Sequence, residues 1–256
     1  MSIPSIALTE PVGQEGAPVV VLGPSLGTSS IVWELVEPTL REHFRTSTWD
    51  LPGHGTSQKA TDPFTVAELA EGLHRAMAAL EGPVLYAGIS LGGATGLELL
   101  LSHPDAVAAA AIVCASPRFG EPGAWHERAA QVRTQGTPVL VRQSAERWFD
   151  DIGRTPVLGG RLLHALSDAD DESYALCCEA LATYDVTARL GEIAVPVLAL
   201  AGEADPVSPP DHAEAIAGGV RRGRAAVVSD ASHLAPAEQP AAVAADLIRF
   251  FEEATR

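Results

Sequence analysis

The chain has 256 residues, enough for one large domain with a sizeable core, and its 46% hydrophobic, 20% charged and 5% aromatic residues are typical of a globular protein. This composition excludes collagen-like, fibrous and intrinsically disordered classes. The net charge of −16 has the wrong sign for binding a phosphate backbone, so nucleic acid and anionic membrane surfaces are disfavoured as partners.

In the first half of the chain, short apolar runs alternate with helical patterns. We expect strands at 18–22, 45–49, 84–87 and 106–115, and helices at 30–44, 66–80 and 94–101. This alternation is typical of βαβ units. It predicts an α/β fold with a mostly parallel central sheet flanked by helices.

A long stretch without strand patterns separates the strand at 106–115 from the next one, at 195–201. Its helical patterns fall at 121–135, 138–149, 157–167 and 171–184, and the chain then continues with a strand at 225–229 and a closing helix at 237–254. We therefore expect a core domain formed by 1–116 and 195–256, with a helical cap, 117–194, inserted into it.

Ser90 lies in the sequence GISLG, between the strand at 84–87 and the helix at 94–101. This is the G-x-S-x-G pattern of a nucleophile elbow, in which a strained turn lifts a serine hydroxyl clear of the sheet. Small residues at 88 and 92 allow the neighbouring backbone to come close. The motif is short, but its position between strand and helix predicts that Ser90 is a nucleophile.

A serine hydroxyl needs a base to accept its proton and an acid to orient that base. His233 follows the last predicted strand, and Asp205 follows the strand at 195–201, which gives the chain order Ser, acid, His. His54 is the rival base and Glu203 the rival acid. We predict a catalytic triad of Ser90, Asp205 and His233.

An oxyanion hole needs two backbone N–H groups that point at the developing negative charge. The residue after the nucleophile, Leu91, supplies one of them. The loop 23–28, which follows the first strand, is the candidate for the second, and we assign it to Leu26.

Several segments resemble the α/β-hydrolase fold family and, more narrowly, the 3-oxoadipate enol-lactonases. They are 24–29 (PSLGTS), 50–57 with the pattern DxxGHGxS, 88–93, 119–133 (FGEPGAWHERAAQVR), 146–149 (ERWF), 174–180 (YALCCEA) and 230–240. The segments in the predicted cap discriminate best, because the whole superfamily shares the elbow and the triad. Two features depart from the family: Pro24 stands where many relatives have His or Asn, and residues 1–16 are short, so we expect an abbreviated first hairpin.

The resemblance implies a serine hydrolase that opens the lactone ring of 3-oxoadipate enol-lactone to 3-oxoadipate, in the β-ketoadipate pathway of aromatic-compound catabolism. The implied partner is a small anionic lactone, which a protein of charge −16 repels at long range. An arginine in the pocket would offset this repulsion. The predicted substrate-binding residues are Trp125, Arg128, Arg133, Arg147 and Trp148, although a cap-surface position for the arginines and a cap-core position for the tryptophans stay open.

Two other functions remain open: a small-ester carboxylesterase with the same triad, and a non-catalytic ligand-binding relative. A serine at position 90 excludes the haloalkane dehalogenase mechanism, which needs a carboxylate there, whereas perhydrolysis by the same triad stays open as a side activity.

Neither a cofactor nor a metal is expected, because the sequence has no HExxH motif and no paired CxxC motifs. Three cysteines cannot build a disulfide framework, and Cys177 and Cys178 fit an apolar helical stripe. No Lys or Arg precedes Arg41, and the longest apolar run is shorter than the roughly 18 residues of a membrane span. We expect a cytoplasmic protein without membrane partners, and the sequence leaves a homo-oligomer open.

Overall fold

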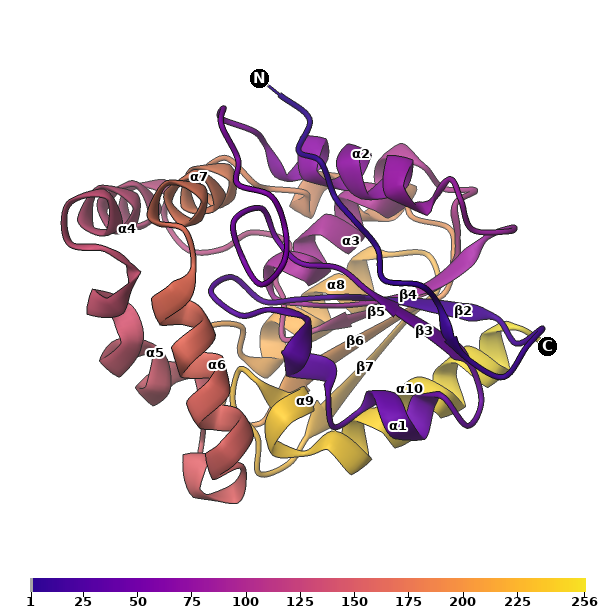
Figure 1. Cartoon of the computed structure of the whole chain (residues 1–256). Coiled ribbons are helices and arrows are strands. Elements are labelled where there is room, and N and C mark those ends of the chain that lie inside the picture. The colour runs from indigo at the N-terminus through magenta and orange to yellow at the C-terminus, as the bar shows by residue number, and fades with distance from the viewer. Residues whose placement is uncertain (1) are drawn as a thin grey trace.

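A seven-stranded sheet forms the centre of the computed structural model, which describes residues 2–256 (Figure 1). The strands are β1 (Val12–Gly13), β2 (Val19–Gly23), β3 (Arg45–Thr48), β4 (Val84–Ile89), β5 (Val107–Val113), β6 (Val197–Gly202) and β7 (Gly223–Val228). Their order is β1-β3-β2-β4-β5-β6-β7, and only the β1–β3 pair is antiparallel. The predicted α/β class with a mostly parallel sheet is confirmed.

Helices cover both faces of this sheet. The α-helices are α1 (Glu37–Leu40), α2 (Val66–Met77), α3 (Leu91–Ser102), α4 (Pro122–Gln135), α5 (Val141–Trp148), α6 (Pro156–Asp168), α7 (Asp171–Ala182), α8 (Pro210–Gly219), α9 (Ala235–Glu238) and α10 (Pro240–Ala254). The 3-10 helices are η1 (Ser30–Trp33), η2 (Thr137–Leu140), η3 (Ile152–Arg154) and η4 (Thr187–Glu192). In Figure 1, α1 and α10 lie on one face of the sheet, and α2, α3 and α8 lie on the other.

The local sequence explains the central elements. Strands β4 and β6 are apolar and buried along their whole length, because helices cover both faces of a parallel sheet. Helix α2 begins with a capping box, in which the Thr65 hydroxyl accepts from the Glu68 N–H and the Glu68 carboxylate accepts from the Thr65 N–H. The predicted catalytic residues follow the carboxyl ends of β4, β6 and β7, so the parallel sheet places them at one edge.

Prolines change several of the expected helix boundaries. The single helix expected at 30–44 is wrong, because η1 and α1 occupy this stretch separately. Pro38 has no N–H and fits only the first turn of a helix, which is where α1 has it. Pro138 likewise lies in η2, so that only the second part of the expected helix 138–149 is α-helical, and Pro240 begins α10 as a helix separate from α9.

Two further differences concern an edge of the sheet and an unexpected helix. Strand β1 has two residues and pairs with β3 rather than with β2, so no first hairpin forms between β1 and β2. Helix α8 was not expected from the sequence. Its buried side chains, Ala213 and Ile216, make too short a stripe to show a helical period.

Between β5 and β6 the chain forms helices α4 to α7, which lie together at the left of Figure 1. We call residues 117–194 the helical insertion. Cys177 and Cys178 are fully buried in its helix α7, as expected for core residues. Within residues 2–256, no helix is both long and apolar enough to cross a membrane. The cytoplasmic location stays a prediction.

Candidate active site

Ser90 occupies a strained turn between the end of β4 and the start of α3. Its φ of 55° lies in the left-handed region, which costs a non-glycine residue about 1–3 kcal/mol. Two hydrogen bonds hold this turn: the Ser90 N–H donates to the Val113 carbonyl at 2.9 Å, and the Gly92 N–H donates to the Pro24 carbonyl at 2.9 Å. A Cβ at Gly92 would lie 2.6 Å from that Pro24 oxygen, so the turn requires glycine there.

Gly88, on the other side of Ser90, gives a test of this close packing. A Cβ at position 88 would collide with the carbonyl oxygen of Gly92, which is backbone and cannot move aside. We expect Gly88→Ala to lower the free energy of unfolding by about 1–3 kcal/mol, measured by urea denaturation. Gly160→Ala in α6 is the control, because nothing lies within 4 Å of the added methyl group. Equal stability of the two variants would contradict the close packing.

His233 and Asp205 form a buried pair after β7 and β6. His233 Nδ1 lies 2.9 Å from Asp205 Oδ2, and the two side chains are 3% and 0% exposed. The other Asp205 oxygen accepts the backbone N–H groups of Val207 at 2.8 Å and Ser208 at 3.0 Å. Burial acts to raise the pKa of Asp205, but His233 and these N–H groups outweigh it, so the pKa lies below its ordinary value. An ionised Asp205 accepts the Nδ1 proton and leaves His233 Nε2 free to act as a base.

The rival residues have other partners. Both ring nitrogens of His54 are engaged, since Nδ1 lies 2.9 Å from the Pro52 carbonyl and Nε2 accepts the Gly27 N–H at 3.1 Å. Burial lowers the pKa of His54, which favours this neutral form. Glu203 is exposed, and its carboxylate accepts the Asp230 N–H at 3.4 Å. Neither residue has the geometry that the predicted triad needs.

The backbone N–H groups of Leu26 and Leu91 make no hydrogen bond to any group in residues 2–256, so both can donate to a ligand. Leu91 is the first residue of α3. The loop around Leu26 is held by the bond from Gly27 to His54 and by the Thr28 hydroxyl, which contacts the N–H and the carbonyl of Ser25. His54 thus supports the candidate oxyanion loop, a role that its sequence pattern did not reveal.

A cavity of about 390 Å³ opens at Ser90, between the core and the helical insertion. Leu26 and His233 line it together with the predicted Trp125, Arg128, Arg147 and Trp148. Its other lining residues are Ser25, Phe119, Gly120, Glu121, Ala124, Ser144, Tyr174, Leu181, Pro206 and Val207. Sequence reasoning missed Phe119 and Tyr174 as cavity residues, although both lie in segments that carry the family resemblance.

The cavity contains two cations without a carboxylate partner. Neither Arg128 nor Arg147 forms an ion pair with any side chain of residues 2–256. The Arg128 guanidinium lies over the Trp125 ring, 5.3 Å from its centroid. Burial and, second, the charge of Arg128 lower the pKa of Arg147. The nearby Glu121 carboxylate is paired with Arg118 at 2.9 Å, which leaves the two cavity arginines available to an anion.

The expectation that Arg133 binds substrate is corrected by the structure. Arg133 is absent from the cavity lining. Its guanidinium forms ion pairs with Glu172 at 2.8 Å and Glu179 at 2.5 Å, which join α4 to α7. Arg133 therefore ties two helices of the insertion together. In the part of the chain that the structure describes, no cluster of three or more His, Cys, Asp or Glu side chains is placed to hold a metal.

A mostly parallel sheet with a serine elbow after a central strand defines the class of alpha/beta hydrolases. The sequence profile of the Alpha/beta hydrolase family matches residues 19–246, and the chain belongs to this family.

Relatives within the family differ in activity. The chain is 32% identical over 233 residues to 3-oxoadipate enol-lactonase 2 of Acinetobacter baylyi, covering 90% of this chain and 87% of the relative. It is also 30% identical over 217 residues to a pimeloyl-[acyl-carrier protein] methyl ester esterase of Photorhabdus laumondii, covering 76% and 77% of the two chains. The crystal structure of the enol-lactonase from Burkholderia xenovorans LB400 superposes with a TM-score of 0.90 at 30% identity, covering 96% of each chain. These relatives support a hydrolase and leave its substrate to be inferred from the site.

Proposed function

We propose that this hydrolase opens the lactone ring of 3-oxoadipate enol-lactone to give 3-oxoadipate, a step of the β-ketoadipate pathway. The observation that carries this proposal is the presence of Arg128 and Arg147, without carboxylate partners, in the cavity that contains Ser90. Their guanidinium groups suit the carboxylate of a small anionic lactone. The similarity to enol-lactonases over most of the chain supports the same substrate.

In the proposed reaction, Ser90 Oγ attacks the lactone carbonyl carbon while His233 Nε2 takes the hydroxyl proton. The Leu26 and Leu91 N–H groups donate to the oxyanion of the tetrahedral intermediate. When this intermediate collapses, the ring C–O bond breaks, and the leaving enolate oxygen receives the proton from His233. The enol then tautomerises to a ketone. Water, activated by His233, hydrolyses the acyl-enzyme and releases 3-oxoadipate.

The test is the steady-state rate of the purified protein on enzymatically generated 3-oxoadipate enol-lactone, measured beside the neutral ester p-nitrophenyl acetate. We expect kcat/KM to be several orders of magnitude higher on the lactone. Activity confined to the ester would overturn the proposed substrate.

A small-ester carboxylesterase is the second candidate, because a methyl ester esterase is 30% identical over 76% of this chain. A non-catalytic ligand-binding relative is the third. Reaction with a serine-directed organophosphate separates this last candidate from the enzymes, since only an activated Ser90 is labelled.

The arginines give a prediction specific to the anionic substrate. We expect Arg147→Met to raise KM for the lactone about 10- to 100-fold, the range for loss of a hydrogen bond between charged groups. Its kinetics on p-nitrophenyl acetate should stay unchanged. Arg142→Met is the matched control, because Arg142 lies on the same helix and is exposed, as Arg147 is, but does not line the cavity. An equal effect of Arg147→Met on both substrates would count against a carboxylate-binding role.

A further inference from the structure

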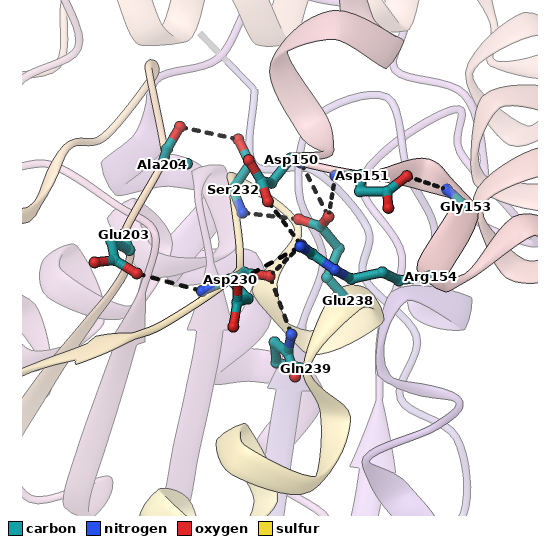
Figure 2. Close-up of polar contacts among 10 residues, drawn as sticks. All are labelled: Asp150, Asp151, Gly153, Arg154, Glu203, Ala204, Asp230, Ser232, Glu238 and Gln239. Carbon is teal, nitrogen blue, oxygen red and sulfur yellow. Dashed lines mark hydrogen bonds and ion pairs between the residues drawn. The ribbon is translucent and has the colours of Figure 1, made fainter.

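Glu238 is a buried carboxylate at the end of α9, only 6% exposed. It accepts three backbone N–H groups: Ser232 at 2.7 Å on one oxygen, and Asp150 at 2.9 Å and Asp151 at 3.0 Å on the other (Figure 2). No cation in residues 2–256 pairs with it. Burial raises the pKa of Glu238, while the three N–H groups favour its charged form.

The three N–H groups belong to the two sides of the candidate active site. Ser232 immediately precedes His233. Asp150 and Asp151 follow the end of α5, the helix that carries Arg147 and Trp148 into the cavity. One carboxylate therefore connects the loop of the proposed base to the cavity wall of the helical insertion.

Additional bonds connect the same two segments. The Leu234 N–H donates to the Trp148 carbonyl at 2.9 Å, and the Ser232 hydroxyl lies 3.0 Å from the Arg147 carbonyl. The Ser232 hydroxyl also lies 3.3 Å from the Ala204 carbonyl, next to Asp205. The loop that carries His233 thus contacts both the loop of Asp205 and the end of α5, which carries Arg147.

The charged groups around Glu238 hold the loop from its exposed side. Arg154 donates to the Asp150 carboxylate at 2.7 Å and to the Asp230 carbonyl at 2.8 Å, as Figure 2 shows. Asp230 has a φ of 55°, and the Gln239 side chain also donates to its carbonyl, at 3.1 Å. These hydrogen bonds are solvent-exposed. The bond from the Ser232 N–H to Glu238 is buried, so water competes less for it.

We propose that Glu238 is a positioning residue that fixes His233 relative to Arg147 and Trp148, which line the cavity on the side of the helical insertion. This role rests on the proposed function, which assigns His233 as the base and the residues Arg147 and Trp148 as part of the substrate-binding site. Glu238 itself does not line the cavity, so it acts only through the residues that it holds.

Two substitutions of Glu238 distinguish its contact with the loop of His233 from its contacts with the helical insertion. In Glu238→Gln, the side-chain carbonyl can still accept the N–H groups of Asp150 and Asp151, but the amide group then presents a donor to the Ser232 N–H. The segment with Arg147 and Trp148 then stays in place, whereas the loop that carries His233 loses the hydrogen bond from the Ser232 N–H. In Glu238→Ala, both sides lose their bonds.

We expect Glu238→Gln to lower kcat about 10- to 100-fold on the lactone and on p-nitrophenyl acetate, because small displacements of reacting groups are costly, with little change in KM. Glu238→Ala should lower kcat similarly and also raise KM for the lactone. Hydrogen exchange provides a readout independent of activity: the Ser232 amide should exchange faster in both variants, and the Asp150 and Asp151 amides only in Glu238→Ala. Glu203→Gln is the control, because Glu203 is an exposed carboxylate on the loop after β6 and does not contact the N–H groups that Glu238 binds.

Folded variants with wild-type kcat and KM on both substrates would overturn the positioning role, even with a lower melting temperature. If Glu238→Ala does not fold, the isosteric Glu238→Gln variant carries the test. If the wild-type protein does not open the lactone, the proposed substrate fails, while kcat on the ester and hydrogen exchange still test Glu238. If neither substrate is turned over, the rate of organophosphate labelling of Ser90 takes the place of kcat.

Discussion

Replacing Ser90 by alanine is expected to lower kcat on the enol-lactone about 10⁴- to 10⁶-fold, because the variant has no oxygen to attack the carbonyl carbon. The fold should persist, since alanine and serine meet the same strain at a φ of 55°. Single-turnover and steady-state rates measure the loss. Circular dichroism and the melting temperature establish that the variant is folded.

Ser144→Ala is the matched control for this variant. Ser144 is a second buried serine that lines the same cavity, but it lies on α5, away from the elbow. It should keep a kcat close to that of the wild type. An organophosphate should add mass to the wild type and to Ser144→Ala, and should leave Ser90→Ala unlabelled. Wild-type activity in Ser90→Ala would exclude the proposed nucleophile.

The site residues that the sequence predicts most directly are those with a local signal. Ser90 is recognisable because a strand, two glycines and a helix surround it within a few positions. Asp205 and His233 follow strands, and parallel strands bring their carboxyl ends to one edge of the sheet. His233 pairs with Asp205 because β6 and β7, which the two residues follow, are adjacent parallel strands.

Residues whose roles depend on helix orientation were harder to identify. Arg128, Arg133 and Arg147 look alike in sequence, yet Arg128 and Arg147 line the cavity, whereas Arg133 meets two glutamates on α7. Which side of a helix faces a cavity depends on packing between helices that are distant in sequence. The local pattern around each arginine contains no such information.

The roles of Glu238 and His54 also could not be predicted from the local sequence, because their hydrogen-bond partners are distant in the chain. Glu238 binds the N–H groups of residues 87 and 88 positions away, and His54 binds Gly27, 27 positions away. In the sequence, Glu238 is one acidic residue near the start of an amphipathic helix. Its burial and its three donors become visible only when the insertion is folded against the loop after β7.

Replacing Asp205 by asparagine should lower kcat about 10⁴-fold with little change in KM. Asparagine can still accept the N–H groups of Val207 and Ser208 at its carbonyl oxygen, and its amide then faces His233 Nδ1 as a donor. The imidazole must accept at Nδ1, so its proton moves to Nε2. A protonated Nε2 cannot take the proton of Ser90.

The test combines the kinetic measurement with a determination of the His233 tautomer. Nitrogen NMR of ¹⁵N-histidine-labelled protein should show the His233 proton on Nδ1 in the wild type and on Nε2 in Asp205→Asn. Glu203→Gln should change neither the tautomer nor kcat, because Glu203 contacts Asp230 rather than His233. Asp205 itself does not line the cavity, so an altered KM would indicate a displaced loop instead of a changed tautomer. A kcat near wild type in Asp205→Asn would mean that the buried pair does not orient the base, and Glu203 would then become the acid to test.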